Sequence, residues 1–228
     1  MQFVVTTICT LMAICSLAWA GPLPKRASID FDVYYGGGLK IGKASQRWVI
    51  EGERYRLDTM LIPILGPTIH YVSEGRLAKE GLIPSRFEER RGKSDDLRNF
   101  CEFDWKILVA KFGEPDNPQS GELEKGAQDI NAFPYQLSYV GDGTGMQIAT
   151  GKKLRHDTFG KAGTAKLKID SNELSLVVLR SADGDSRSEV WLSPAHHNLP
   201  LKLSRAEGNN TIEFVARHVE IEPTERKE

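Results

Sequence analysis

The run of residues most able to do chemistry is RFEERR, which begins at Arg86. Alternate side chains of an extended strand share one face, so Arg86, Glu88 and Arg90 are expected to lie side by side. Such a row is typical of cross-strand ion pairs on a solvated sheet. If Glu74 and Asp104 from neighbouring strands join this row, the cluster would line a cleft that binds a ligand. With two carboxylates in different environments, the same cluster would instead suit a hydrolase.

Three tryptophans, Trp48, Trp105 and Trp191, lie within stretches of strand-like pattern. Tryptophan side chains most often pack in the core, but at the mouth of an incompletely closed barrel they would contact an apolar ligand. We therefore predict a ligand site formed by the tryptophans and the charged cluster. Its predicted residues are Trp48, Trp105, Trp191, Glu74, Arg86, Glu88, Arg90 and Asp104.

The adjacent pair His196-His197, which lies beside Pro194 and Pro200, suggests either a metal site or a corner between two strands. Zinc takes three or four converging ligands, and the other histidines stand at no ligand-like spacing. Neighbouring side chains of an extended backbone also point to opposite faces. The pattern favours a corner, and we expect neither a bound metal nor another cofactor.

The elements that must position these residues are mostly strands. Residues 29–34 alternate apolar and polar types, and Gly36-Gly37-Gly38 then allows the positive φ of a tight hairpin. Turn signals recur between short apolar runs along the chain, which predicts an antiparallel sandwich or open barrel. Further strands are expected around residues 44–50, 55–60, 69–77, 82–91, 98–105, 107–112, 147–149, 152–159, 174–179, 187–192, 199–204 and 211–220.

One short helix is expected in this mostly β chain. Apolar residues recur at spacings of three, four and three from Ile130 to Val140, which is the spacing of a helix face. Asp129 is of a residue type that caps a helix start, whereas Pro134 restricts where the helix can begin. We expect the helix to begin near Phe133.

The first residues indicate export. No charged residue occurs from Phe3 to Ala20, and Ala18-Trp19-Ala20 has the small-x-small pattern of a signal-peptidase site. Cleavage between Ala20 and Gly21 would release the mature chain into the periplasm. The alternative is an inner-membrane anchor formed by residues 3–20, a stretch just long enough to span a bilayer.

The remaining length suits one domain. Within this domain the polar stretch at residues 113–126 resembles a linker. The expected organisation is a signal peptide at 1–20, a linker at 21–28, a single antiparallel β domain at 29–221 and a charged tail at 222–228.

Charge and cysteine content exclude several classes of protein. The chain has 30 Lys and Arg against 31 Asp and Glu, well mixed, for a formal charge of −1. The absence of a basic face argues against a nucleic-acid partner. Cys101 is the only cysteine beyond residues 1–20, so the mature chain is expected to form no internal disulfide. With the signal cleaved, no transmembrane span is expected in the mature chain.

Five stretches of the chain, taken in order, resemble the exported bacterial family of unknown function DUF3108. The similarity runs from about Ile29 to Glu220. The resemblance implies a Gram-negative envelope protein with a mostly antiparallel β fold, and it brings no established activity and no catalytic residues. The stretches are YYGGGLKIGKASQRWVIEGERYRL, YVSEGRLAKEGLIPSRFEERRG, FDW at 103–105, GAQDINAF and WLSPAHHNLPLKL.

These observations favour a non-catalytic periplasmic protein over an enzyme. Its curved sheet is expected to bind an apolar or amphiphilic ligand such as a lipid, or a partner protein of the envelope. The alternative is an envelope hydrolase that uses carboxylates near the Arg/Glu cluster. A third hypothesis is a scaffold that joins envelope proteins through an exposed sheet edge.

Overall fold

The computed structural model describes residues 23–183 and 186–222. The predicted cleavage site at Ala20 and Gly21 lies outside the described residues, as do residues 223–228 of the expected tail. In the described part, fifteen strands form one sheet in the order β8-β7-β6-β5-β4-β3-β2-β1-β15-β14-β13-β12-β11-β10-β9. Neighbouring strands pair antiparallel, apart from β9 and β10, which are parallel. The prediction of a mostly β, antiparallel open architecture with one short helix is confirmed.

The strands in chain order are β1 (Arg26–Tyr35), β2 (Leu39–Glu51), β3 (Arg54–Pro63), β4 (Ile69–Ala78), β5 (Gly81–Arg91), β6 (Asp96–Asp104), β7 (Val109–Glu114), β8 (Asn117–Glu122), β9 (Gln128–Asp129), β10 (Thr144–Ala149), β11 (Leu154–Ile169), β12 (Asn172–Asp183), β13 (Ser186–Ser193), β14 (Leu199–Glu207) and β15 (Asn210–Ile221). The helix α1 spans Phe133–Val140, and a 3-10 turn, η1, spans Pro194–His196. The helix begins at Phe133, as its spacing predicts.

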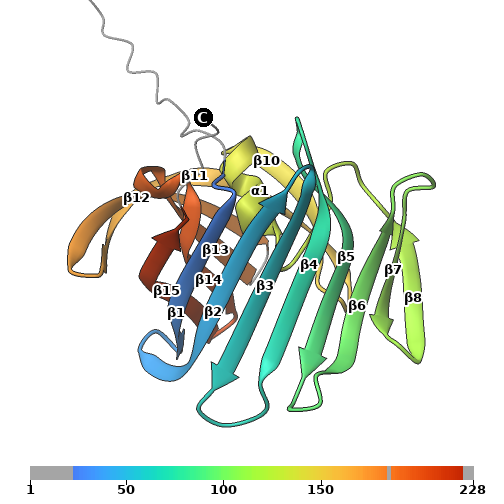
Figure 1. Ribbon diagram of the computed structural model, residues 1–228, viewed down its shortest axis with the longest axis horizontal. Coiled ribbons are helices and arrows are strands. Elements are labelled where there is room, and N and C mark those ends of the chain that lie inside the picture. The colour runs from blue at the N-terminus through green and yellow to red at the C-terminus, as the bar shows by residue number, and fades with distance from the viewer. Residues whose placement is uncertain (1–22, 184–185, 223–228) are drawn as a thin grey trace, which may run out of the picture.

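Strand β1 joins the two halves of the sheet. It pairs with β2 along one edge and with the last strand, β15, along the other. Its inward residues Ile29, Phe31 and Val33 are at most 1% exposed, which explains the period-two pattern. The sheet curls so that β13, β14 and β15 lie behind β1, β2 and β3, with α1 near one end of the curve (Figure 1). Residues from the two ends of the sequence therefore face one another across the interior.

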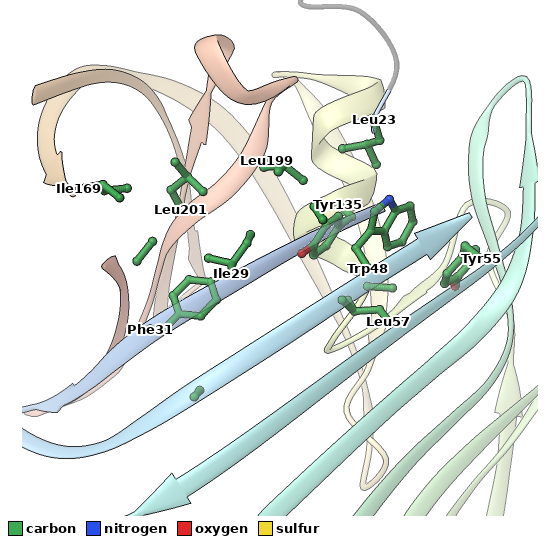
Figure 2. Packing of buried hydrophobic residues seen from close by; sticks show 14 of the residues in the cluster. Leu23, Ile29, Phe31, Trp48, Tyr55, Leu57, Tyr135, Ile169, Leu199 and Leu201 are labelled. Carbon is green, nitrogen blue, oxygen red and sulfur yellow. The ribbon is translucent and has the colours of Figure 1, made fainter. Parts of the chain in front are cut away.

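The centre of the core is a stack of aromatic rings. The Trp48 ring lies between Tyr135 of α1, at a centroid distance of 4.8 Å, and Tyr55 of β3, at 5.5 Å. Figure 2 shows these rings packed against Leu57 and Leu23. The Trp48 Nε1–H donates a hydrogen bond of 2.9 Å to the carbonyl of Pro24. This bond satisfies the one polar group of a fully buried side chain, so the ring contributes its whole apolar area to the fold.

The expected linker at residues 113–126 is wrong as a description of this stretch. Strand β8 lies within it and pairs with β7 from Glu122 back to Asn117. Because β8 is the last strand at one edge of the sheet, nearly all its side chains are exposed. An edge strand that buries little has no need of alternating apolar residues, so its composition is like that of a linker.

The corner after β13 has the predicted architecture. It consists of η1 followed by His197 and Asn198, whose φ angles of 54° and 58° are left-handed. The Ser193 hydroxyl lies 2.9 Å from His196 Nδ1, which ties the corner to the strand that enters it. Among the described residues, no group of three or more His, Cys, Asp or Glu side chains is placed to hold a metal ion.

The helices of the described region are too short or too polar to cross a bilayer.

Replacing Trp48 with alanine is expected to lower the free energy of unfolding by about 3–5 kcal/mol, because it leaves a cavity in the aromatic stack. Ile107→Ala is the matched control, since Ile107 is 68% exposed and a surface change should cost less than about 0.5 kcal/mol. Urea unfolding followed by circular dichroism measures both. Equal losses in the two variants would contradict the assigned core.

Candidate ligand site inside the curved sheet

The Arg/Glu row predicted from sequence lies on the outer face of the sheet, opposite the buried side chain of Phe87. Arg86 Nε lies 2.6 Å from Glu88 Oε1, and Arg90 Nη2 lies 2.7 Å from Glu88 Oε2. Glu74 lies on the same outer face and pairs with Arg56 of β3. The sheet therefore brings four of the predicted residues together around one outer-face hollow, where Arg86, Glu88 and Arg90 form cross-linked ion pairs.

Glu88 is held in its charged form. Partial burial would raise the pKa of Glu88, but hydrogen bonds from Arg86 and Arg90 outweigh that effect and place the pKa below its ordinary value. Asp104 lies apart from this pair, at the end of β6. Its Oδ1 accepts hydrogen bonds from the backbone N–H groups of Lys106 and Ile107, so its observed contacts are those of a turn cap.

The three tryptophans belong to two separate hydrophobic clusters. Trp48 belongs to the aromatic core. Trp105 stacks on Phe103 at 5.9 Å, and its Nε1 donates to the carbonyl of Pro84. Trp191 is partly buried and packs against the same hydrophobic cluster as Trp48. Its Nε1 donates to Glu189, and Lys202 Nζ lies 4.5 Å from the ring centroid. The structure does not gather the eight residues predicted from sequence around one site.

The interior is instead organised by residues 127–140, which we call the plug. The plug enters the curved sheet as β9 and α1. Its Asp129 is fully buried and accepts hydrogen bonds from Ser73 Oγ of β4 and from the backbone N–H groups of Asn131 and Ala132. The structure places α1's N-cap at Ala132, so Asp129 fixes the turn before the helix rather than capping it.

Amide side chains attach the plug to the inner faces of β3 and β5. Asn131 donates to the carbonyl of Leu57 at 3.1 Å and accepts from Thr59 Oγ1 at 2.7 Å. Gln128 donates to the Leu82 carbonyl at 2.8 Å, and Gln136 accepts from the Leu82 N–H at 2.7 Å. Each bond satisfies a buried polar group that would otherwise destabilise the interior.

A cavity of about 310 Å³ lies beside the plug, between β2, β3 and β4 on one side and β11, β13, β14 and β15 on the other. This volume is within the range of small-molecule sites. Two larger hollows, of about 650 and 410 Å³, contain many charged residues of the outer face. Much of the inner cavity wall is apolar, and this part is formed by Ile130, Phe133, Leu203, Ile212 and Phe214.

Polar side chains form a row along the C-terminal wall of the same interior. Arg155 Nη1 lies 3.2 Å from Asp157 Oδ2, and Ser181 Oγ donates to Asp157 Oδ1 at 3.3 Å. Ser181 is the register partner of Ser188, and Arg205 Nη1 donates to Ser188 Oγ at 2.9 Å. The row therefore runs from β11 through β12 and β13 to β14, with its side chains next to one another across the strands.

Sequence reasoning missed this row. The available signal was the period-two position of its members: Asp157 lies two residues before the buried Phe159, and Ser188 lies two before the buried Val190. Polar residues at inward positions of otherwise apolar strands indicate either a buried network or a ligand site. The sequence alone does not indicate that four such positions lie side by side across neighbouring strands.

The fold is that of a barrel-like antiparallel β protein, and it contains an inner cavity of small-molecule size. The family model of the protein of unknown function DUF3108 matches residues 30–217, so the chain belongs to this family. The predicted resemblance is confirmed.

Among solved structures, the chain is similar to a β-barrel-like protein of domain of unknown function DUF1849 from Brucella abortus. The TM-score is 0.58 at 9% sequence identity, and the match covers 89% of this chain and 99% of that chain. At this identity the likeness shows the fold alone. A search of curated proteins finds no match.

Asp129 is expected to make stability depend on pH. Burial raises the pKa of Asp129 to about 6, from 3.8, against the hydrogen bonds from Ser73 and the backbone. The neutral form is therefore favoured in the folded state. The resulting stability is fully present below the unfolded pKa and is lost as the pH rises through the folded pKa.

Between pH 5 and pH 7.5 the wild type should lose about 1 kcal/mol more of its free energy of unfolding than Asp129→Asn, which cannot ionise. Urea unfolding at the two pH values measures this difference. Asp104→Asn, at an exposed carboxylate, serves as the control and should follow the wild type. If Asp129→Asn loses as much free energy of unfolding between the two pH values as the wild type, ionisation of Asp129 is not the cause of the loss.

Proposed function

We propose that this protein binds one small apolar or amphiphilic molecule inside its curved sheet, without catalysis, in the periplasm of a Gram-negative cell. The observation that carries the proposal is the inner cavity of about 310 Å³ with its apolar wall. Export rests on the pattern of residues 1–20 and on the resemblance of the chain to an exported family.

The make-up of the wall supports binding of an acyl chain or a similar apolar group. Phe133 from the plug, Leu203 from β14 and Phe214 from β15 all line the cavity, and none of them is fully exposed. An apolar group that leaves water for such a wall gains roughly 25 cal/mol per Å² of buried apolar surface. The polar lining is sparse, as is usual where a few groups orient a mostly apolar ligand.

The hydrolase hypothesis has less support. A pair of carboxylates for acid and base chemistry needs divergent environments around one reacting bond. Glu74 is paired with Arg56 on the outer face, and Asp104 accepts hydrogen bonds within its own turn. Neither contact leaves the two groups converging on a common substrate position.

The proposal predicts saturable binding of the neutral probe N-phenyl-1-naphthylamine to the purified protein, seen as a rise in probe fluorescence. Leu203→Trp should weaken this binding at least about tenfold, because a larger ring would fill the cavity and remove apolar area from the ligand. Circular dichroism and a thermal melt confirm that the variant is folded.

Ile107→Trp is the matched control. It adds the same ring at a position that is 68% exposed and remote from the cavity lining, so its probe affinity should equal that of the wild type. Absence of saturable binding to the wild type would refute the proposed function, as would equal affinities of the Leu203→Trp and wild-type proteins.

A further inference from the structure

The Arg155 side chain is unusual among the charged groups of the interior. It is only 10% exposed and it lines the inner cavity. Its Nη1 forms the ion pair with Asp157, but within residues 23–183 and 186–222 its Nε has no hydrogen-bond partner. A buried N–H donor without an acceptor costs about 1–3 kcal/mol, and more when it belongs to a charged group.

The charges around the cavity favour an anion. Arg205 lines the same space and is 27% exposed, and its carboxylate partner Glu207 is 60% exposed to solvent. Glu189 also contributes to the lining, but its carboxylate is paired with Arg180 at 2.8 Å. The lining therefore holds two guanidinium groups, those of Arg155 and Arg205, against one carboxylate, that of Glu189, which Arg180 already pairs.

A guanidinium with free N–H groups is well suited to a carboxylate, because its planar donors match the two carboxylate oxygens. The polar row lies along one wall, whereas Phe133 and Phe214 supply apolar wall in the same cavity. The volume of about 310 Å³ is near the lower end for small-molecule sites, which suits one alkyl chain better than two.

We propose that the ligand is a single-chain carboxylate amphiphile of the fatty-acid class, an inference that rests on the proposed function. Its carboxylate accepts hydrogen bonds from Arg155, and its chain lies against Phe133, Leu203 and Phe214. The ligand carboxylate then supplies the acceptor that the Arg155 Nε–H otherwise lacks. The ion pair with Asp157 keeps the guanidinium in place.

Dodecanoate and dodecanol test this assignment, because they share a chain and differ in the charged end. Each displaces N-phenyl-1-naphthylamine from the purified protein, and the displacement gives its affinity. The wild type should bind dodecanoate at least about tenfold more tightly than dodecanol, the factor expected for a hydrogen bond to a charged group. A ratio near one would overturn this inference, whereas loss of all binding, including that of the probe, would refute the proposed function itself.

The double variant Arg155→Met with Asp157→Asn removes the guanidinium without leaving its partner charged and buried. It should bring the dodecanoate-to-dodecanol ratio close to one while probe and dodecanol affinities stay at wild-type values. Arg217→Met is the matched control, since Arg217 is half exposed and pairs with Asp30 on the surface. A ratio that persists in the double variant would overturn the role of Arg155.

Arg155→Lys provides a second measurement should the double variant fail to fold. Lysine keeps the positive charge for Asp157 but lacks the planar pair of donors. Its dodecanoate affinity should fall several-fold while its dodecanol affinity is unchanged. Equal losses for both ligands would indicate a purely structural role and would overturn the inference.

Discussion

The plug can lie inside the sheet only because its polar groups find partners there. A chain segment that turns within an apolar interior exposes backbone and side-chain groups that must be hydrogen-bonded. Asp129, Gln128, Asn131 and Gln136 supply those bonds, and they reach β3, β4 and β5. With the plug held there, Tyr135 stacks on Trp48. The curvature of the sheet, the aromatic core and the cavity wall all depend on this attachment.

The two faces of the curved sheet handle charge in different ways. On the outer face, Arg86 and Arg90 pair with Glu88 in contact with solvent, where each pair contributes little to stability. On the inner face a charge must be paired and hydrogen-bonded to be tolerated. Asp157 meets that condition through Arg155 and Ser181. Arg155 is paired with Asp157, but its Nε lacks a hydrogen-bond partner among the described residues. This unsatisfied donor distinguishes the inner wall, as a candidate ligand site, from the ion pairs of the outer face.

The pairing of β1 with β15 joins the two halves of the sheet around one interior. It places the inner faces of the N-terminal and C-terminal halves opposite each other, so Thr59 and Phe214 line one cavity although they are far apart in the chain. The joined sheet still has two edges, β8 and β9. Because this joined sheet is curved (Figure 1), its inner face is concave although the barrel is not complete.

The sequence by itself determined most of the strands, the start of the helix at Phe133, the corner at His196 and the family, because period-two burial, proline and glycine act over a few residues. It failed at β8, whose exposed edge leaves no apolar pattern. It also grouped Trp48 with Arg86, which lie on opposite faces of the sheet. Only the tertiary structure decided that Arg155, Ser188 and Arg205 share one wall, because register and curvature arise from pairing between distant strands.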